Sequence, residues 1–138
     1  MKISEHIFKS ERHQTFYLAA GPEDGDLIYL IHGWPDLSLG WMKQIEFLSQ
    51  QGYRVIAPDM RGYGRSTIHQ NHFDYCQKEI VKDMVELHSS QQHKKAIWIG
   101  HDWGSLVVWN LGLHHSSIVK GLGSLCVPFG WGGHPDSY

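Results

Sequence analysis

Residues 97–108, IWIGHDWGSLVV, decide the fold of this chain. The run 96–99, which overlaps the start of this stretch, is uncharged and rich in residues that favour β-structure, which is typical of a strand buried on both faces. Gly100 and Gly104 follow, with Asp102 midway between them, and apolar residues then recur at helical spacing. The pattern predicts a buried strand, a very tight turn and a helix that ends near residue 115.

The tight turn has the pattern small-x-nucleophile-x-small of a nucleophile elbow, with Asp102 at its centre and His101 beside it. Because Gly100 and Gly104 lack Cβ atoms, the strand and the helix can approach closely. Asp102 would then project in a strained conformation, next to backbone N–H groups that favour negative charge. The alternative is that Asp102 is an ordinary helix N-cap.

Composition limits the class of protein. The chain has 138 residues, of which 41% are hydrophobic and 19% charged, which is typical of one globular domain with a real core. The formal net charge is −2 and no basic patch occurs, so we expect no nucleic-acid partner. Residues 1–13 lack the apolar core of a signal peptide, and no run is long enough to span a membrane. We therefore expect a cytoplasmic protein without a membrane partner.

Cysteine and histidine usage argues against disulfide and metal sites. Cys76 and Cys126 lie in different predicted elements, which favours reduced thiols. The chain has 11 histidines, but no H-E-x-x-H motif and no Cys/His cluster accompany them. We expect solvated surface histidines, no metal and no cofactor.

The other elements follow from periodicity and turn chemistry. Strands are predicted at 3–8, 14–20, 27–31, 53–57 and 119–127, and helices at 39–51 and 76–91. Ser38 is expected to cap the first helix and Gly52 to end it, whereas 67–75 and 128–135 are expected to be irregular. Strands that alternate with helices predict an α/β fold of three layers, with a mostly parallel sheet and helices on both faces.

A second motif, His32-Gly33-Trp34-Pro35, follows the predicted strand 27–31. In an open parallel sheet, ligands bind beyond the carboxyl ends of the strands, and this motif and the elbow both follow such ends. Gly33 allows a sharp turn that would aim the N–H of Trp34 into a site. Together with the N–H of Trp103, it would form an oxyanion hole. The alternative is a plain Gly-Pro turn.

The loop 58–66, PDMRGYGRS, is rich in glycine. It is not a dinucleotide fingerprint, because the third glycine is missing and no helix follows directly. We assign Asp59 and Arg61 to the structure of this loop rather than to catalysis.

Three motifs together, HGWP at 32–35, DMRGYGRS at 59–66 and GHDWG at 100–104, resemble the N-terminal half of an α/β-hydrolase of the epoxide hydrolase type. The resemblance covers nearly the whole chain. It implies one incomplete core domain over 1–138, without a cap domain, and a cis peptide between Trp34 and Pro35. It also implies Asp102 as the nucleophile and the N–H groups of Trp34 and Trp103 as the oxyanion hole. The residues that would shape this site are His32, Gly33, Pro35, Gly100, His101 and Gly104.

The implied chemistry begins with a carboxylate that attacks an sp³ carbon and forms an ester with the enzyme. Water activated by a histidine, which an acid orients, then cleaves the ester. In the family, this histidine, its acid and the cap that shapes the pocket lie in the C-terminal half, and the present chain stops at Tyr138. His134 and Asp136 are poor replacements, because they lie two residues apart in a Gly-rich tail.

Three interpretations remain open. In the first, the chain is a truncated hydrolase that acts on a small-molecule epoxide. In the second, it is a truncated hydrolase that acts on an alkyl halide, as haloalkane dehalogenases do. Trp103 suits both enzymes, whereas Trp34 stands where dehalogenases tend to carry Asn and so favours the epoxide. The third interpretation is a non-catalytic remnant that self-associates through the exposed edge of the strand 119–127.

Overall fold

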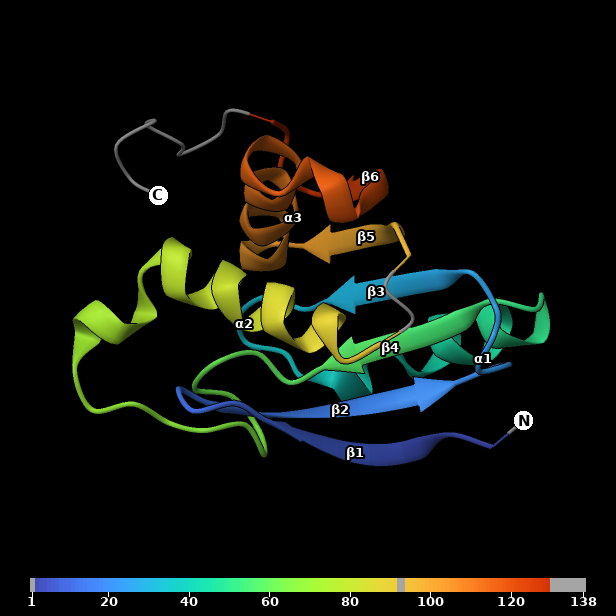
Figure 1. Ribbon diagram of the computed structural model, residues 1–138, viewed down its shortest axis with the longest axis horizontal. Helices are drawn as coiled ribbons and strands as arrows, with labels where there is room; N and C mark the ends of the chain where they lie inside the picture. The colour runs from blue at the N-terminus through green and yellow to red at the C-terminus, as the bar shows by residue number, and fades with distance from the viewer. Residues whose placement is uncertain (1, 92–93, 130–138) are drawn as a thin grey trace.

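One six-stranded sheet organises the molecule, whose computed structural model describes residues 2–91 and 94–129 (Figure 1). The strands lie in the order β1-β2-β4-β3-β5-β6. Their bounds are β1 (Ser4–Lys9), β2 (Gln14–Ala20), β3 (Leu27–Ile31), β4 (Arg54–Pro58), β5 (Ala96–His101) and β6 (Val119–Leu125). The neighbours among β3, β4, β5 and β6 pair in parallel, whereas β2 runs antiparallel to both β1 and β4.

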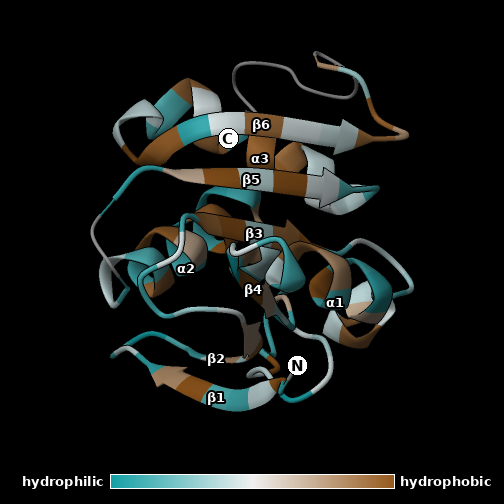
Figure 2. Ribbon diagram, turned by 90° about the vertical axis from the view of Figure 1, so that its right-hand side faces the viewer, coloured by the Kyte–Doolittle hydropathy of each residue, from teal (hydrophilic) through white to brown (hydrophobic). Residues whose placement is uncertain are grey.

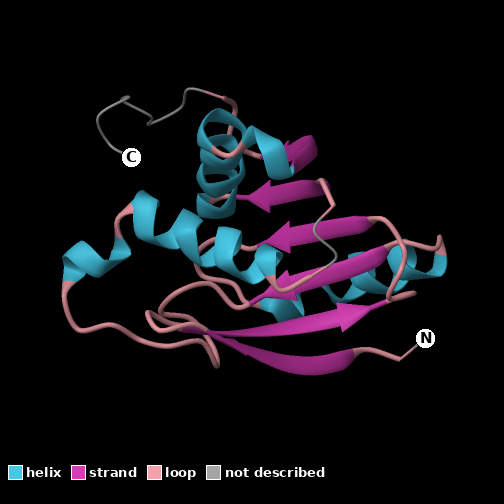
Figure 3. Cartoon of the chain, viewed as in Figure 1, coloured by secondary structure: helices cyan, strands magenta, loops and turns pink. Residues whose placement is uncertain are grey.

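Helices cover both faces of this sheet (Figure 3). Helix α1 (Met42–Gln50) packs on one face, and α2 (Gln77–Ser89) and α3 (Trp103–His114) pack on the other. Short 3₁₀ helices are η1 (Ser38–Trp41), η2 (His72–Tyr75) and η3 (Ser116–Ile118). The predicted three-layer α/β fold with a mostly parallel sheet is confirmed.

The core explains why β3 carries no charge. All five residues of β3 are buried, and Figure 2 shows hydrophobic residues along this strand. On the face of α2 and α3, the ring of Trp98 stacks on Tyr29 with centroids 3.8 Å apart. The hydroxyl of Tyr29 lies 2.8 Å from Nδ1 of His88, so this buried polar group is hydrogen-bonded. On the opposite face, the predicted alternation of β2 is confirmed, because Phe16, Leu18 and Ala20 pack together.

The start of the first helix differs from the prediction. Ser38 does not cap it: Ser38 lies inside η1, Leu37 occupies the cap position without a side-chain bond, and the Ser38 hydroxyl is buried without a hydrogen-bond partner. The N–H of Ser38 donates to Oδ1 of Asp59 at 2.9 Å, so a carboxylate from the loop after β4 satisfies this backbone group instead. Gly52 ends α1 as predicted, with φ +97° and its N–H bonded to the carbonyl of Ser49.

Two further boundaries differ. The segment 67–75, expected to be irregular, contains η2, because the N–H of Asp74 bonds back to the carbonyl of Asn71. The last strand ends at Leu125 rather than at residue 127, because Cys126 adopts φ +76°, which is incompatible with an extended strand. Within the described residues, none of the helices has both the length and the apolar character needed to cross a bilayer.

Candidate active site

Asp102 alone makes the turn between β5 and α3. Its backbone angles are φ 57° and ψ −124°, a sparsely populated conformation that costs about 1–3 kcal/mol. Asp102 occupies the N-cap position of α3, but its side chain makes no capping bond and its backbone angles are not the extended ones of an ordinary N-cap, so capping does not explain this aspartate. The turn is held through its backbone, since the Asp102 carbonyl accepts the N–H of Ser105 at 3.0 Å.

Two glycines make this turn possible. A Cβ atom at Gly100 would lie 2.3 Å from the carbonyl oxygen of Gly104, and a Cβ at Gly104 would lie 2.2 Å from the carbonyl oxygen of Ile31. No real Cβ tolerates such distances to backbone atoms. The close approach of strand and helix that the sequence predicted is therefore confirmed, and it extends to the end of β3.

The HGWP loop lies directly on the elbow. A Cβ at Gly33 would be 2.5 Å from the Cβ of Asp102, so only glycine fits there. This approach lets the backbone N–H of Trp34 donate a hydrogen bond of 3.0 Å to Oδ2 of Asp102. The peptide between Trp34 and Pro35 is cis, as the resemblance implied. Oδ1 of Asp102 accepts no hydrogen bond within the part of the chain that the structure describes.

His32 ties this loop to the loop after β4. Its Nε2 accepts the N–H of Met60 at 2.9 Å, so Nδ1 carries the proton and donates to the carbonyl of Gly33 at 2.9 Å. Burial lowers the pKa of His32 below its ordinary value of 6.5 and keeps the ring neutral. Both ring nitrogens are occupied, so His32 shapes the site but has no nitrogen free to activate a water molecule.

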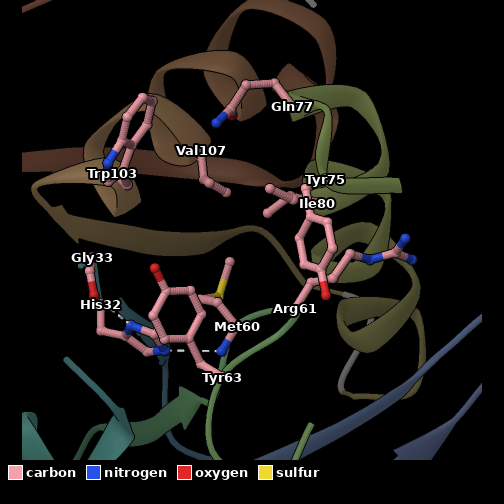
Figure 4. A pocket seen from close by; sticks show the side chains of 10 residues that line it. All are labelled: His32, Gly33, Met60, Arg61, Tyr63, Tyr75, Gln77, Ile80, Trp103 and Val107. Atoms are coloured by element: carbon pink, nitrogen blue, oxygen red, sulfur yellow. Dashed lines mark hydrogen bonds between the residues drawn. The ribbon is translucent and has the colours of Figure 1, made fainter. Parts of the chain in front are cut away.

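A cavity of about 310 Å³ opens near the elbow, and Asp102 itself is not one of its lining residues (Figure 4). Gly33 and Trp103, which contact or follow Asp102, both line it. The full lining is His32, Gly33, Met60, Arg61, Tyr63, Tyr75, Gln77, Ile80, Trp103 and Val107. Burial, followed by the negative charge of Asp102, raises the pKa of Tyr63 above its ordinary value of 10.0.

Asp59 and Arg61 have the structural roles that the sequence predicted. Oδ1 of Asp59 accepts the N–H of Ser38 at 2.9 Å, and Oδ2 accepts the N–H of Arg65 at 3.1 Å. Arg61 forms a buried bidentate pair with Asp83 of α2, with bonds of 2.7 and 2.8 Å. Arg61 also forms part of the cavity wall.

Two features of this site were not predicted from the sequence. Asp83 lies on the inward stripe of α2 with Ile80, Met84 and Leu87, and a charge on an apolar stripe is a signal for a buried ion pair. The cavity residues Tyr63 and Gln77 gave no signal, because they come from separate segments that meet only in the folded chain.

The predictions about metal ligands and cysteines concern side chains that lie apart in the described structure. Within residues 2–91 and 94–129, no three His, Cys, Asp or Glu side chains group as metal ligands, and Cys76 and Cys126 are exposed and unpaired with each other. His134 and Asp136 lie outside the described residues.

Comparison with known families supports the fold assignment. A sequence model of the α/β-hydrolase fold family matches residues 26–136, which is most of the chain. This chain belongs to that family.

The relatives of this α/β-hydrolase include epoxide hydrolases. Epoxide hydrolase A of Mycobacterium tuberculosis is 39% identical over 109 residues, which cover 79% of this chain and 34% of that protein. The crystal structure of epoxide hydrolase A from Mycobacterium thermoresistibile superimposes with a TM-score of 0.89 and 36% identity, over 92% of this chain and 40% of that one. An epoxide hydrolase from Vigna radiata gives a TM-score of 0.88 at 32% identity, over 92% of this chain and 41% of that one. The chain thus spans about a third to two fifths of the length of these relatives.

Proposed function

We propose that this chain carries the nucleophilic part of an epoxide hydrolase active site, with Asp102 as the nucleophile. One observation carries the proposal: the N–H of Trp34 holds Oδ2 of Asp102, while Oδ1 accepts no bond from the described residues. The two oxygens are therefore unequal, one held by the protein and one left for reaction. The similarity to named epoxide hydrolases points to the same chemistry.

In the first step, a lone pair on Oδ1 attacks one carbon of the epoxide from behind. The bond between that carbon and the epoxide oxygen breaks, and the oxygen keeps the electron pair and takes up a proton. The product is an ester in which Oδ1 is the alkyl oxygen and Oδ2 is the carbonyl oxygen. Oδ2 already lies where a backbone donor contacts it, at 3.0 Å from the nitrogen of Trp34.

In the second step, water attacks the carbonyl carbon of the ester and negative charge develops on Oδ2. The N–H of Trp34, joined by that of Trp103, would stabilise this charge, and one such donor is typically worth about 3 kcal/mol. This step needs a base, and His32 does not qualify because its two nitrogens are occupied. We propose that residues 1–138 on their own form the ester and hydrolyse it very slowly.

An alkyl halide is the second candidate substrate. The same carboxylate displaces a halide from an sp³ carbon, and Trp103, which lines the cavity directly after Asp102, offers an indole N–H that suits a halide. We rank it below the epoxide because the relatives named above are epoxide hydrolases.

The non-catalytic alternative is self-association. Within the described residues, β6 pairs only with β5, so its other edge offers free backbone groups. If this edge pairs with a second copy of the chain, analytical ultracentrifugation should detect a dimer. The substitution Leu122→Pro should abolish this dimer. A monomer at all concentrations would rule this alternative out.

The experiment that tests the proposed function uses the 138-residue chain and styrene oxide. Intact mass spectrometry should show one adduct per chain, removed by hydroxylamine as expected for an ester. Asp102→Asn should form no such adduct. The exposed thiols of Cys76 and Cys126 also react with epoxides, but their thioethers resist hydroxylamine, so both variants should also carry Cys→Ser at these positions. Turnover of many epoxides per chain would refute the claim that a further base is needed.

A further inference from the structure

The cavity near the elbow combines apolar walls with few polar groups. Met60, Ile80 and Val107 come from the loop after β4, from α2 and from α3 (Figure 4). The carbonyl oxygen of the Gln77 side chain is held by Nδ2 of Asn110 at 3.3 Å, and Arg61 is held by Asp83. The protein therefore already uses much of the polar surface at this cavity.

Two tyrosines line the cavity but direct their hydroxyls differently (Figure 4). The hydroxyl of Tyr75 points away and is bonded to the backbone of His69, whose N–H it accepts at 2.8 Å. The hydroxyl of Tyr63 points toward the side where Trp103 and Val107 lie, and it bonds to none of the described residues. The Tyr63 ring is fixed by an edge contact with His32, with centroids 5.0 Å apart. Tyr63 thus presents a positioned donor to whatever occupies the cavity.

We propose that this cavity binds an aryl-sized apolar group of the substrate and that the Tyr63 hydroxyl donates a hydrogen bond to an oxygen attached beside that group. The inference rests on the proposed function and names its substrate class, the aryl epoxides, in which that oxygen belongs to the epoxide ring.

The size and the protonation state of the site fit this class. An engineered cavity of about 150 Å³ binds benzene. The cavity here, about 310 Å³, holds a group about twice that size. The raised pKa of Tyr63 keeps its hydroxyl protonated at neutral pH, so it acts as a donor.

The test uses two non-reactive probes of the same planar shape, acetophenone and α-methylstyrene, which differ by a carbonyl oxygen in place of a CH₂ group. Affinities are measured by ligand-observed NMR titration of the 138-residue chain. The unmodified chain should bind acetophenone about three- to tenfold more tightly, the margin of one hydrogen bond. Tyr63→Phe should remove this margin and leave the affinity for α-methylstyrene unchanged.

Two further variants complete the design. Tyr75→Phe, which removes a hydroxyl that points out of the cavity, should keep the margin. Ile80→Trp, at a half-buried position, should weaken both probes at least tenfold by filling the cavity. Thermal melts of each variant identify loss of fold.

The inference is overturned if the unmodified chain binds neither probe saturably, or if the margin survives in Tyr63→Phe. Its failure is distinguishable from failure of the proposed function. Binding with the expected margin, but without an ester on Asp102, would keep the cavity assignment and remove the hydrolase proposal. An ester on Asp102 without probe binding would do the reverse.

Discussion

The ends of β4 and β5 each carry an aspartate, and the structure treats the two carboxylates in opposite ways. Asp59 follows β4 and is 3% exposed, and each of its carboxylate oxygens accepts one backbone N–H. Asp102 follows β5, is half-buried, and receives a single N–H while its backbone adopts φ +57°.

The difference separates a carboxylate whose two oxygens are both bonded to the protein from one that we propose as a nucleophile. Asp59 joins three segments, because its two oxygens accept N–H groups from η1 and from the loop after β4. Asp102 stabilises little and keeps an oxygen unbonded within the described residues, at a conformational cost that folding elsewhere must offset. An aspartate at the end of a strand therefore does not by itself indicate function, and the hydrogen bonds that its carboxylate makes distinguish the two positions.

The largest expected effect comes from substituting the two aspartates in parallel. Asp102→Asn should slow ester formation with styrene oxide by at least about ten-thousand-fold, because the amide is not a nucleophile. Asp59→Asn should leave the reaction of the folded fraction within a few-fold, but should lower the free energy of unfolding by about 2–3 kcal/mol through a lost bond to a charged acceptor. Adduct formation by mass spectrometry and urea unfolding measure the two effects.

A strong loss of stability in Asp102→Asn, or a loss of reactivity in fully folded Asp59→Asn, would contradict this separation of roles. Glu46→Gln, on an exposed position of α1, is a matched control that should change neither property.

The next largest effect concerns the buried ion pair between Arg61 and Asp83. Asp83→Asn leaves Arg61 buried without its anion and should lower the free energy of unfolding by about 3–5 kcal/mol. Urea unfolding of this variant should be compared with Asp83→Asn/Arg61→Met. If removing both charges does not recover stability relative to Asp83→Asn alone, the charge pairing is not what stabilises this region.

Two glycine substitutions test how tightly the backbone is packed at the elbow compared with β6. Gly104→Ala places a methyl group against the carbonyl of Ile31 and should cost about 1–3 kcal/mol, while displacing the N-terminus of α3. Gly121→Ala in β6 meets only the side chain of Ile97 at 3.8 Å and should be tolerated. Equal melting temperatures for the two variants would show that the elbow is not tightly packed.

The smallest effect is on the pH dependence of stability. Burial lowers the pKa of His13 to about 4, and its Nε2 is buried without a hydrogen-bond partner. Between about pH 4 and 6.5, His13 binds a proton in the unfolded chain but not in the folded chain. The contribution of His13 to the free energy of unfolding is therefore complete only above about pH 6.5. It should fall as the pH decreases from about 6.5 towards 4, and His13→Asn should flatten this slope in urea titrations. An unchanged slope would remove His13 as its source.

Much of the fold could be predicted from sequence because its signals are local. The uncharged run of β3 and the alternation of β2 indicate buried faces directly. The predicted cap at Ser38 was wrong because the carboxylate of Asp59, distant in sequence, accepts the N–H of Ser38, and the end of β6 depends on one residue with positive φ. Neither of these two features produces a periodic pattern in the sequence.

The candidate site divides in the same way. Gly33, Gly100 and Gly104 could be singled out because only a missing Cβ permits the approaches found here. The cavity and Tyr63 could not, since a cavity is defined by what surrounding elements fail to fill. Asp83 was detectable in principle as a charge on an apolar stripe, but its partner Arg61 lies in a loop without periodicity.

The most direct test of the central claim is to locate the adduct after styrene oxide treatment, by proteolysis and fragment mass spectrometry of the chain with both cysteines replaced by serine. We expect a hydroxylamine-labile adduct on Asp102 alone, with Asp59 unmodified. An adduct spread over several surface carboxylates, or located at a residue other than Asp102, would contradict it.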